Sequence, residues 1–312
     1  MLNILDLTDI SDYVNYEGLV LIQSYQKKLD DSNRPLNGEL VCQGKTLKFK
    51  VWDKSIQGIL NQNELEGKIA LITGKGGSYK EVKDITIESI RFDHGFTDVS
   101  AFVKAVNIDS VFSRFADFIN KNLTPQGVSL VTGVFNAEGL LDSFKHAWAA
   151  KRMHDAQVGG LMNHTTKMLH LAKAMIENDP RVEPYKDIIY TGIIFHDIGK
   201  IFELDNMGKY TKNSFAGHRT IGVEIMARNK GLFLQYFDEE FYYHILEIIT
   251  GHHGYEYGDE PKTVWALIVH YIDMLDSQLT GMMDVIEVND IVDQNGNKAV
   301  WHPGKGVKNL VF

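Results

Sequence analysis

The segment Ile188–Lys200, with the sequence IIYTGIIFHDIGK, places a histidine and an aspartate directly after a long apolar run. The run from Ile188 to Phe195 predicts a buried helix, and Gly199 occupies the position expected for a helix C-cap. Adjacent histidine and aspartate side chains at a buried helix end are costly unless both are satisfied. A bound metal ion satisfies both, so His196 and Asp197 are predicted metal ligands.

Helical periodicity extends on both sides of this segment, from about residue 98 to about residue 285. Ten of the twelve histidines fall between positions 146 and 270, which localises any chemistry to this helical part. The predicted helices cover residues 107–122, 138–152, 160–178, 183–198, 218–229, 239–251 and 262–283.

Four further segments present histidine or aspartate on predicted helices. His164 shares one face with apolar residues, His218 opens a helix, His252 and His253 close one, and Asp273 interrupts an apolar stripe. Each alone is more often a hydrogen-bonded structural residue. Together they favour a metal centre, because packing alone would have to supply every one of these buried groups with its own partner.

The first 95 residues have a different pattern, typical of β structure. Five candidate strands cover residues 18–22, 37–41, 45–52, 67–74 and 79–92, and a short helix is expected at 55–61. Five short strands with a helix after the third predict an OB-like barrel, with an SH3-like barrel as the alternative.

The third candidate strand alternates strictly. Lys48, Lys50, Trp52 and Lys54 share one face, while Phe49 lies on the other. We therefore expect Phe49 in the barrel core and Trp52 exposed, with Lys48, Lys50 and Trp52 contacting a single-stranded nucleic acid. The alternative is a solvated lysine face with no ligand.

Composition narrows the class of protein. A net charge of −9 disfavours a protein that coats duplex nucleic acid. The single cysteine, Cys42, excludes a thiolate zinc cluster within one chain. No apolar run approaches the roughly 20 residues of a membrane span, and the first residues do not form a secretory signal. We expect a cytoplasmic protein without a membrane partner, and homo-oligomerisation stays open.

The order of these residues resembles the HD-domain superfamily of metal-dependent phosphohydrolases. Within that superfamily the segments are similar to those of YhaM-type 3′→5′ exoribonucleases, in which an OB-fold precedes the HD domain. The matching segments are Gly159–Thr165, Ile194–Lys200, Gly217-His218, His252-His253-Gly254 and Tyr271–Asp276. Val158 and the loop after His253 depart from that pattern.

The resemblance implies a ligand set and a number of metals. His164, His196, Asp197 and Asp273 would hold one ion. Asp197 would bridge to a second ion held by His218, His252 and His253, giving two divalent metals per chain. Imidazole and carboxylate ligands suit Mn²⁺, which we favour, and also Fe²⁺, Co²⁺, Ni²⁺ or Mg²⁺, with zinc as a further option.

Other residues near the predicted centre are assigned to the substrate or to the ligands. Lys200 is either a helix-dipole partner or a catalytic cation on a phosphate oxygen, and the resemblance favours the second. Arg219 and His154 are weaker candidates for substrate binding. Asp276 is expected to orient a ligand from behind.

The sequence therefore predicts a hydrolase with three segments: an OB-like barrel over 1–95, an α-helical HD phosphohydrolase domain over 96–286, and an unassigned tail over 287–312. The expected activity is a 3′→5′ exonuclease on single-stranded RNA, or DNA, using a metal-activated hydroxide. A cyclic-nucleotide or free-nucleotide phosphohydrolase is the first alternative. A non-catalytic single-strand-binding module with a structural metal is the second.

Overall fold

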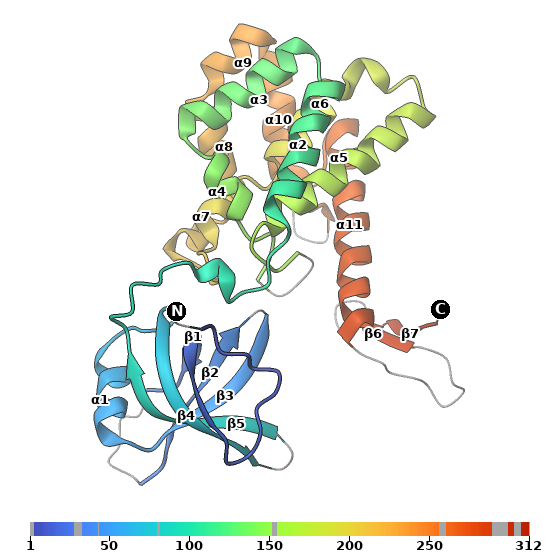
Figure 1. The fold of residues 1–312 in the computed structure, drawn as a ribbon. Coiled ribbons are helices and arrows are strands. Elements are labelled where there is room, and N and C mark those ends of the chain that lie inside the picture. The colour runs from blue at the N-terminus through green and yellow to red at the C-terminus, as the bar shows by residue number, and fades with distance from the viewer. Residues whose placement is uncertain are drawn as a thin grey trace. The chain divides into compact units, whose positions relative to one another are not determined.

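The structure, a computed structural model, describes residues 3–27, 33–42, 44–79, 82–151, 155–255, 260–288, 299–302 and 307–311. The chain divides into two compact units, Met1–Lys104 and Ala105–Phe312. Strands build the first unit, and helices build most of the second (Figure 1). This arrangement confirms the predicted fold class, an OB-like barrel followed by a helical bundle.

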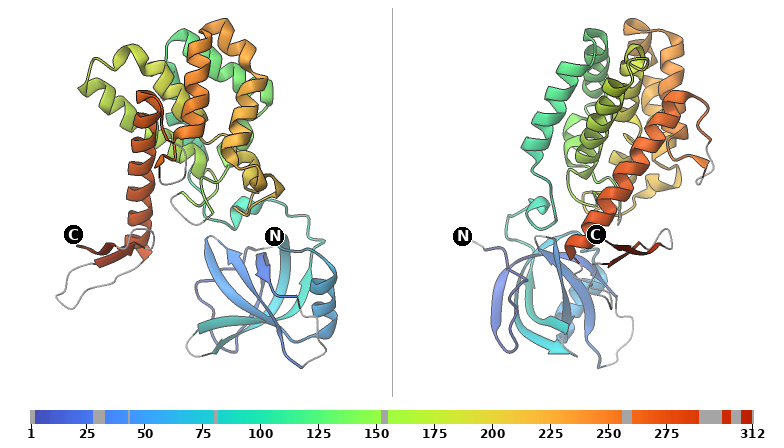
Figure 2. Two further views of the ribbon diagram at one scale, coloured as in Figure 1. Left: turned by 180° about the vertical axis from the view of Figure 1, so that it is seen from behind. Right: turned by 90° about the vertical axis from the view of Figure 1, so that its right-hand side faces the viewer.

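Five strands of the first unit close into a barrel in the order β1-β2-β3-β5-β4, with β4 pairing back to β1. β3 and β5 run parallel, and the other neighbouring strands are antiparallel, which gives the curved barrel seen in Figures 1 and 2. The elements are β1 (Asn15–Tyr25), β2 (Leu36–Cys42), β3 (Lys45–Val51), α1 (Lys54–Gln62), β4 (Ile69–Tyr79) and β5 (Val82–Arg91).

The alternation of β3 confirms which aromatic side chain enters the core. Phe49 is 1% exposed, whereas Trp52 is 51% exposed. The strand ends at Val51, however, because the side chain of Asp53 caps α1 by accepting hydrogen bonds from two backbone N–H groups of its first turn. Trp52 therefore follows the strand, and Lys54 opens the helix, so the predicted four-residue face is shorter than expected.

The last hairpin of the barrel also differs from the prediction. Tyr79 was expected to open the final strand, but it is the last residue of β4. The final strand, β5, begins at Val82. Glycine pairs such as Gly76-Gly77 are typical of turns, but both glycines lie within β4, opposite Ile85 and Asp84.

The second unit is a bundle of helices around one apolar core (Figures 1 and 2). Helices 160–178 and 239–251 have the predicted bounds. The helices are α2 (Ile108–Asn122), α3 (Pro125–Glu138), α4 (Leu141–His146), α5 (Gly160–Asn178), α6 (Lys186–Phe195), α7 (Lys200–Glu203), α8 (His218–Arg228), α9 (Lys230–Tyr236), α10 (Glu239–Gly251) and α11 (Val264–Val288).

The predicted helix at 138–152 is wrong. Thr124 and Pro125 start α3 instead: the Thr124 side chain accepts a hydrogen bond from the Gly127 N–H, and proline suits the first helical position. α3 ends before Gly139, which adopts a left-handed conformation with φ 62°. Only the short α4 falls inside the predicted range.

The C-terminal part contains a two-stranded antiparallel sheet of β6 (Ala299–His302) and β7 (Val307–Val311). Residues 293–296, whose sequence DQNG is typical of a hairpin turn, lie outside the described residues. α11 continues to Val288, beyond its predicted end. Within the described ranges, every helix is too short or too polar to cross a lipid bilayer.

Cys42, at the end of β2, provides a test of the barrel core. It is 3% exposed, and burial raises the pKa of its thiol to about 11. Roughly one thiol in a thousand is then ionised at pH 8, so we expect almost no reaction with a disulfide reagent within minutes. After denaturation one thiol per chain should react. Rapid, complete reaction of the native protein would contradict this packing, and Cys42→Ser provides the blank.

Candidate metal centre

Five helical segments bring histidine and aspartate side chains to one place in the second unit. α5 supplies His164, the turn after α6 supplies His196 and Asp197, and the first residue of α8 is His218. The turn after α10 supplies His252 and His253, and α11 supplies Asp273. The first and the last of these seven residues, His164 and Asp273, are more than a hundred positions apart in the sequence.

The donor atoms of these side chains form groups compact enough to hold metal ions. One group contains Asp197, His218, His252 and His253, and another contains His164, His196 and Asp197. A third combines His196, His252 and Asp273. Within each group the donor atoms lie within 4.8 Å of one another. Because the first two groups share Asp197, this carboxylate stands between two potential ion positions.

Asp197 is the centre of the arrangement and is only 2% exposed. Its Oδ2 lies 3.2 Å from His196 Nε2, and its Oδ1 lies 3.4 Å from His218 Nε2 and 3.5 Å from His252 Nε2. The ammonium of Lys200 lies 2.6 Å from Oδ2. Burial alone would raise the pKa of Asp197, but the Lys200 ammonium, the largest opposing influence, helps to hold it well below its ordinary value.

The other ring nitrogen of four histidines is engaged away from the centre. Nδ1 of His196 and of His252 each contacts a backbone carbonyl, at 2.7 and 2.9 Å. Nδ1 of His164 contacts Asp276 at 2.7 Å, and Nδ1 of His218 contacts Glu203 at 3.0 Å. Carbonyl and carboxylate oxygens only accept, so each Nδ1 carries a proton. In His196, His218 and His252 this tautomer leaves Nε2 directed at the centre.

A metal fits this set of atoms. The buried Nε2 atoms of His196, His218 and His252 and Oδ1 of Asp197 have no hydrogen-bond partner among the described residues. Buried polar atoms without partners are rare in folded proteins, and here they converge. Divalent cations of the Mn²⁺, Fe²⁺ or Co²⁺ type satisfy imidazole and carboxylate donors together.

Gly199 brings two of the ligand segments together. Its φ of −65° is helical, so it is not the left-handed C-cap that the sequence suggested. A Cβ at this position would lie 1.9 Å from the backbone oxygen of His218. Only glycine allows the turn that carries Asp197 to lie this close to the start of α8.

A second glycine has a similar role at the end of α10. Gly254 adopts φ 73°, and a Cβ there would lie 2.4 Å from the ring of His270. That ring donates from Nδ1 to the carbonyl of His252 at 2.7 Å. His270 thus has a structural role, because it holds the turn that presents His252 and His253.

His164 lies between two aspartates, one at each ring nitrogen. Its Nε2 lies 3.2 Å from Asp273, and its Nδ1 lies 2.7 Å from Asp276, the residue predicted to orient a ligand. Burial alone would lower the pKa of His164, but the two carboxylates raise it to about 9. Lys167 lies between Asp276, at 3.0 Å, and Asp155, at 2.7 Å, and so fixes the outer carboxylates.

The predicted substrate-binding residues are divided between the helical unit and the barrel unit. Lys200 is nearly buried beside Asp197, and this neighbour raises its pKa although burial opposes the rise. Arg219 follows His218 in α8, and its Nη1 donates to the Thr250 carbonyl at 3.1 Å. His154 lies outside the described residues. The remaining candidates, Lys48, Lys50 and Trp52, belong to the barrel unit.

Sequence reasoning missed Glu203, Asp155 and Lys167, which contact ligands or their partners. A signal existed for Glu203, because it lies at the end of a helical turn three residues after Lys200. Its pairing with His218 depends on how α7 and α8 pack, and no spacing rule gives that. The pKa of Glu203 is lowered by its hydrogen bond to His218 despite burial.

Comparison with known proteins finds a family match within the helical unit. The HD domain family matches residues 161–278, a range that includes all seven residues of the centre. The match indicates a metal-dependent hydrolase of phosphoester bonds in general. It supports the predicted superfamily, while the substrate is a separate question.

Among solved structures, one match is a crystal structure of Rim1, a mitochondrial single-stranded DNA binding protein from S. cerevisiae. It shares 14% identity, covers 28% of this chain and 100% of that chain, and has a TM-score of 0.24. A match with so low a TM-score carries no argument about the function of this chain.

The shared position of Asp197 can be tested by metal content. Asp197→Asn keeps the shape of the side chain but removes the negative charge that two donor groups share. We therefore expect most of the bound metal to be lost. His218→Ala affects one group and should remove only part of it. Elemental analysis of equilibrated, folded protein gives the metal per chain. Unchanged content in both variants would contradict the shared carboxylate, and thermal melting checks folding.

The support of His218 by Glu203 gives a second test. Glu203→Ala removes the acceptor for Nδ1–H, and loss of such a partner typically weakens metal affinity by about 10–100-fold. Glu203→Gln retains an acceptor and should recover part of that loss. Competition with a chelating indicator measures the affinity. Glu224→Ala, at an exposed carboxylate of the same helix, is the matched control; equal affinities for all variants would exclude a role for Glu203.

Proposed function

We propose that the chain is a metal-dependent phosphodiesterase that removes nucleotides from the 3′ end of single-stranded RNA, with single-stranded DNA as a further substrate. The observation that carries this proposal is the pair of donor groups that share the buried carboxylate of Asp197, with the nearly buried Lys200 beside it. Two ions and a fixed cation suit the charge of a phosphodiester under attack.

Under this proposal His218, His252, His253 and Asp197 hold one ion, and His164, His196, Asp273 and Asp197 hold the other. When bound, divalent ions lower the pKa of a coordinated water and offset the negative charge of the phosphate. Mn²⁺ is the favoured ion for this donor set, and Fe²⁺, Co²⁺, Ni²⁺ or Mg²⁺ are alternatives.

Lys200 supplies the positive charge that the chain itself brings to the reaction. Its raised pKa keeps it an ammonium at physiological pH. It is anchored 2.6 Å from Asp197 and can donate to a non-bridging phosphate oxygen, where charge grows in the transition state. Arg219, one residue after His218, is the second candidate for a phosphate contact, and Asp276 positions His164.

The reaction that follows is hydrolysis at the terminal phosphodiester. The oxygen of a water molecule bonds to phosphorus, the bond to the 3′ oxygen breaks, and that oxygen takes up a proton. The products are a nucleoside 5′-monophosphate and a strand shortened by one nucleotide with a free 3′ hydroxyl. The barrel, which precedes the helical unit in the chain, is proposed to bind the strand.

The activity is tested with full-length protein, Mn²⁺ and 5′-labelled single strands of RNA and DNA. We expect a ladder that shortens from the 3′ end, with mononucleotide products, and no reaction of the Asp197→Asn variant. A panel of cyclic dinucleotides and free nucleotides runs in parallel. Hydrolysis of that panel alone would favour the small-nucleotide enzyme, and metal binding without any hydrolysis would favour a structural ion.

A further inference from the structure

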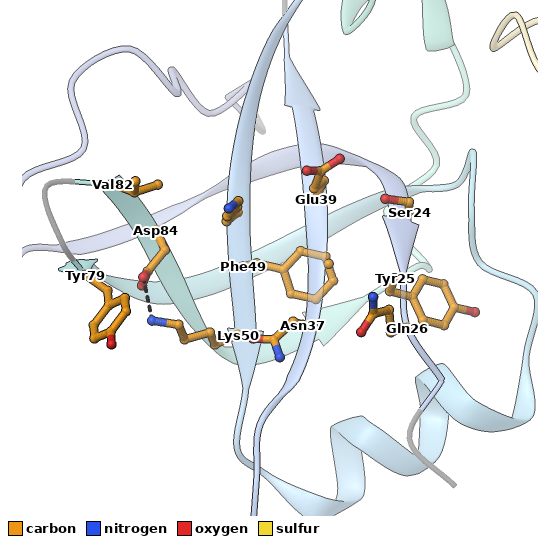
Figure 3. A pocket seen from close by; sticks show the side chains of 12 residues that line it. Ser24, Tyr25, Gln26, Asn37, Glu39, Phe49, Lys50, Tyr79, Val82 and Asp84 are labelled. Carbon is orange, nitrogen blue, oxygen red and sulfur yellow. Dashed lines mark hydrogen bonds and ion pairs between the residues drawn. The ribbon is translucent and has the colours of Figure 1, made fainter.

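A hollow of about 600 Å³ opens on the barrel, and its lining includes Lys48 and Lys50 of the predicted lysine and tryptophan face. It lies between the end of β1, the middle of β2 and β3, the last residue of β4 and the first residues of β5 (Figure 3). Its volume falls within the roughly 300–1,000 Å³ typical of small-molecule sites. Trp52 is not among the residues that line it.

Aromatic rings form the walls of this hollow. Phe49 lies in the middle, with Tyr25 to one side and Tyr79 to the other (Figure 3). Gly38 pairs with Phe49, and a Cβ at Gly38 would lie 2.5 Å from the Phe49 ring, so only glycine leaves room for this ring position. The Tyr25 hydroxyl donates to the Asn63 carbonyl at 2.6 Å, which fixes that ring.

The lysines and the acidic residues that line the hollow are equal in number. Lys50 forms an ion pair of 2.5 Å with Asp84, whose side chain is only 7% exposed. Lys48 is paired with Glu39 in the register of β2 and β3. Two lysines and two acids therefore leave no net charge among the charged lining residues. A groove that follows a phosphate backbone requires an excess of positive charge, which this hollow does not have.

The remaining polar lining suits the edge of a base. Asn37 and Gln26 carry amides that both donate and accept, and Ser24 carries a hydroxyl (Figure 3). Amide side chains next to aromatic rings are the combination that stacks a flat heterocycle and hydrogen-bonds its edge. An aliphatic ligand would leave these polar groups without partners.

We infer that the hollow binds the base of a nucleotide and leaves the phosphates outside. The inference rests on the proposed nucleic-acid substrate, and it names the part of that substrate that the barrel holds. It also replaces Trp52 by Tyr79 as the main stacking residue, because Tyr79 lines the hollow and is 66% exposed before any ligand covers it.

The test measures binding of a fluorescent six-nucleotide strand to full-length protein in EDTA, so that hydrolysis does not contribute. Tyr79→Ala should weaken binding by roughly 5- to 150-fold, the range expected for loss of one base–aromatic stack, and Asn37→Ala should weaken it less. Trp52→Ala is the comparison, with an affinity close to that of the unaltered chain. The reverse order would overturn the inference and restore Trp52 as the stacking residue.

Salt dependence separates base binding from phosphate binding. Loss of a phosphate contact lowers the slope of log affinity against log salt, whereas loss of a stack leaves that slope unchanged. We expect Tyr79→Ala to lower the affinity by the same factor at 50 and 200 mM KCl. A shallower slope for this variant would mean that the hollow binds phosphate, contrary to the inference.

Competing ligands identify the source of the base. Nucleosides and nucleoside 5′-monophosphates that displace the strand show that the hollow accepts free nucleotides as well. If only oligonucleotides displace the strand, the hollow binds bases only within a strand. Either result supports base binding. Strand affinity unchanged in both Tyr79→Ala and Asn37→Ala overturns it. Because no metal is present, that failure leaves the proposed hydrolysis to be decided by its own assay.

Discussion

A buried carboxylate with several imidazoles directed at it is the constraint on which the helical unit depends. Asp197 is almost fully enclosed, and a lone negative charge there would be strongly unfavourable. The ammonium of Lys200 and the Nε2 atoms of three histidines face it, and each of those rings is fixed by a contact at its outer nitrogen. The helices α5, α6, α8, α10 and α11 pack so that these side chains meet at the carboxylate of Asp197.

The sequence was most informative where chemistry and periodicity agree. His196 and Asp197 follow an apolar run that has no exposed face, so their burial was predictable without coordinates. His164 was predictable for the same reason, because it shares a helix face with methionines and leucines. The five barrel strands were also predictable, since β3 alternates as a half-buried strand should.

Contacts between elements were the part that could not be predicted. Glu203 meets His218 only because two short helices pack side by side, and Lys167 meets Asp155 across a turn. The same limit explains the helix missed at 125–138, where a proline and a threonine can equally end one element or start another. At Trp52 a single capping aspartate, Asp53, ended the strand earlier than alternation implied.

The spread of the donor groups along the chain has a consequence for synthesis. Asp273 lies late in the sequence, in the last long helix, while His164 lies in α5. A chain still emerging from the ribosome can fold the barrel, and later α5 and α6, but the group that includes Asp273 does not exist until α11 is made. All seven donor residues are therefore present only once the chain has been synthesised through Asp273.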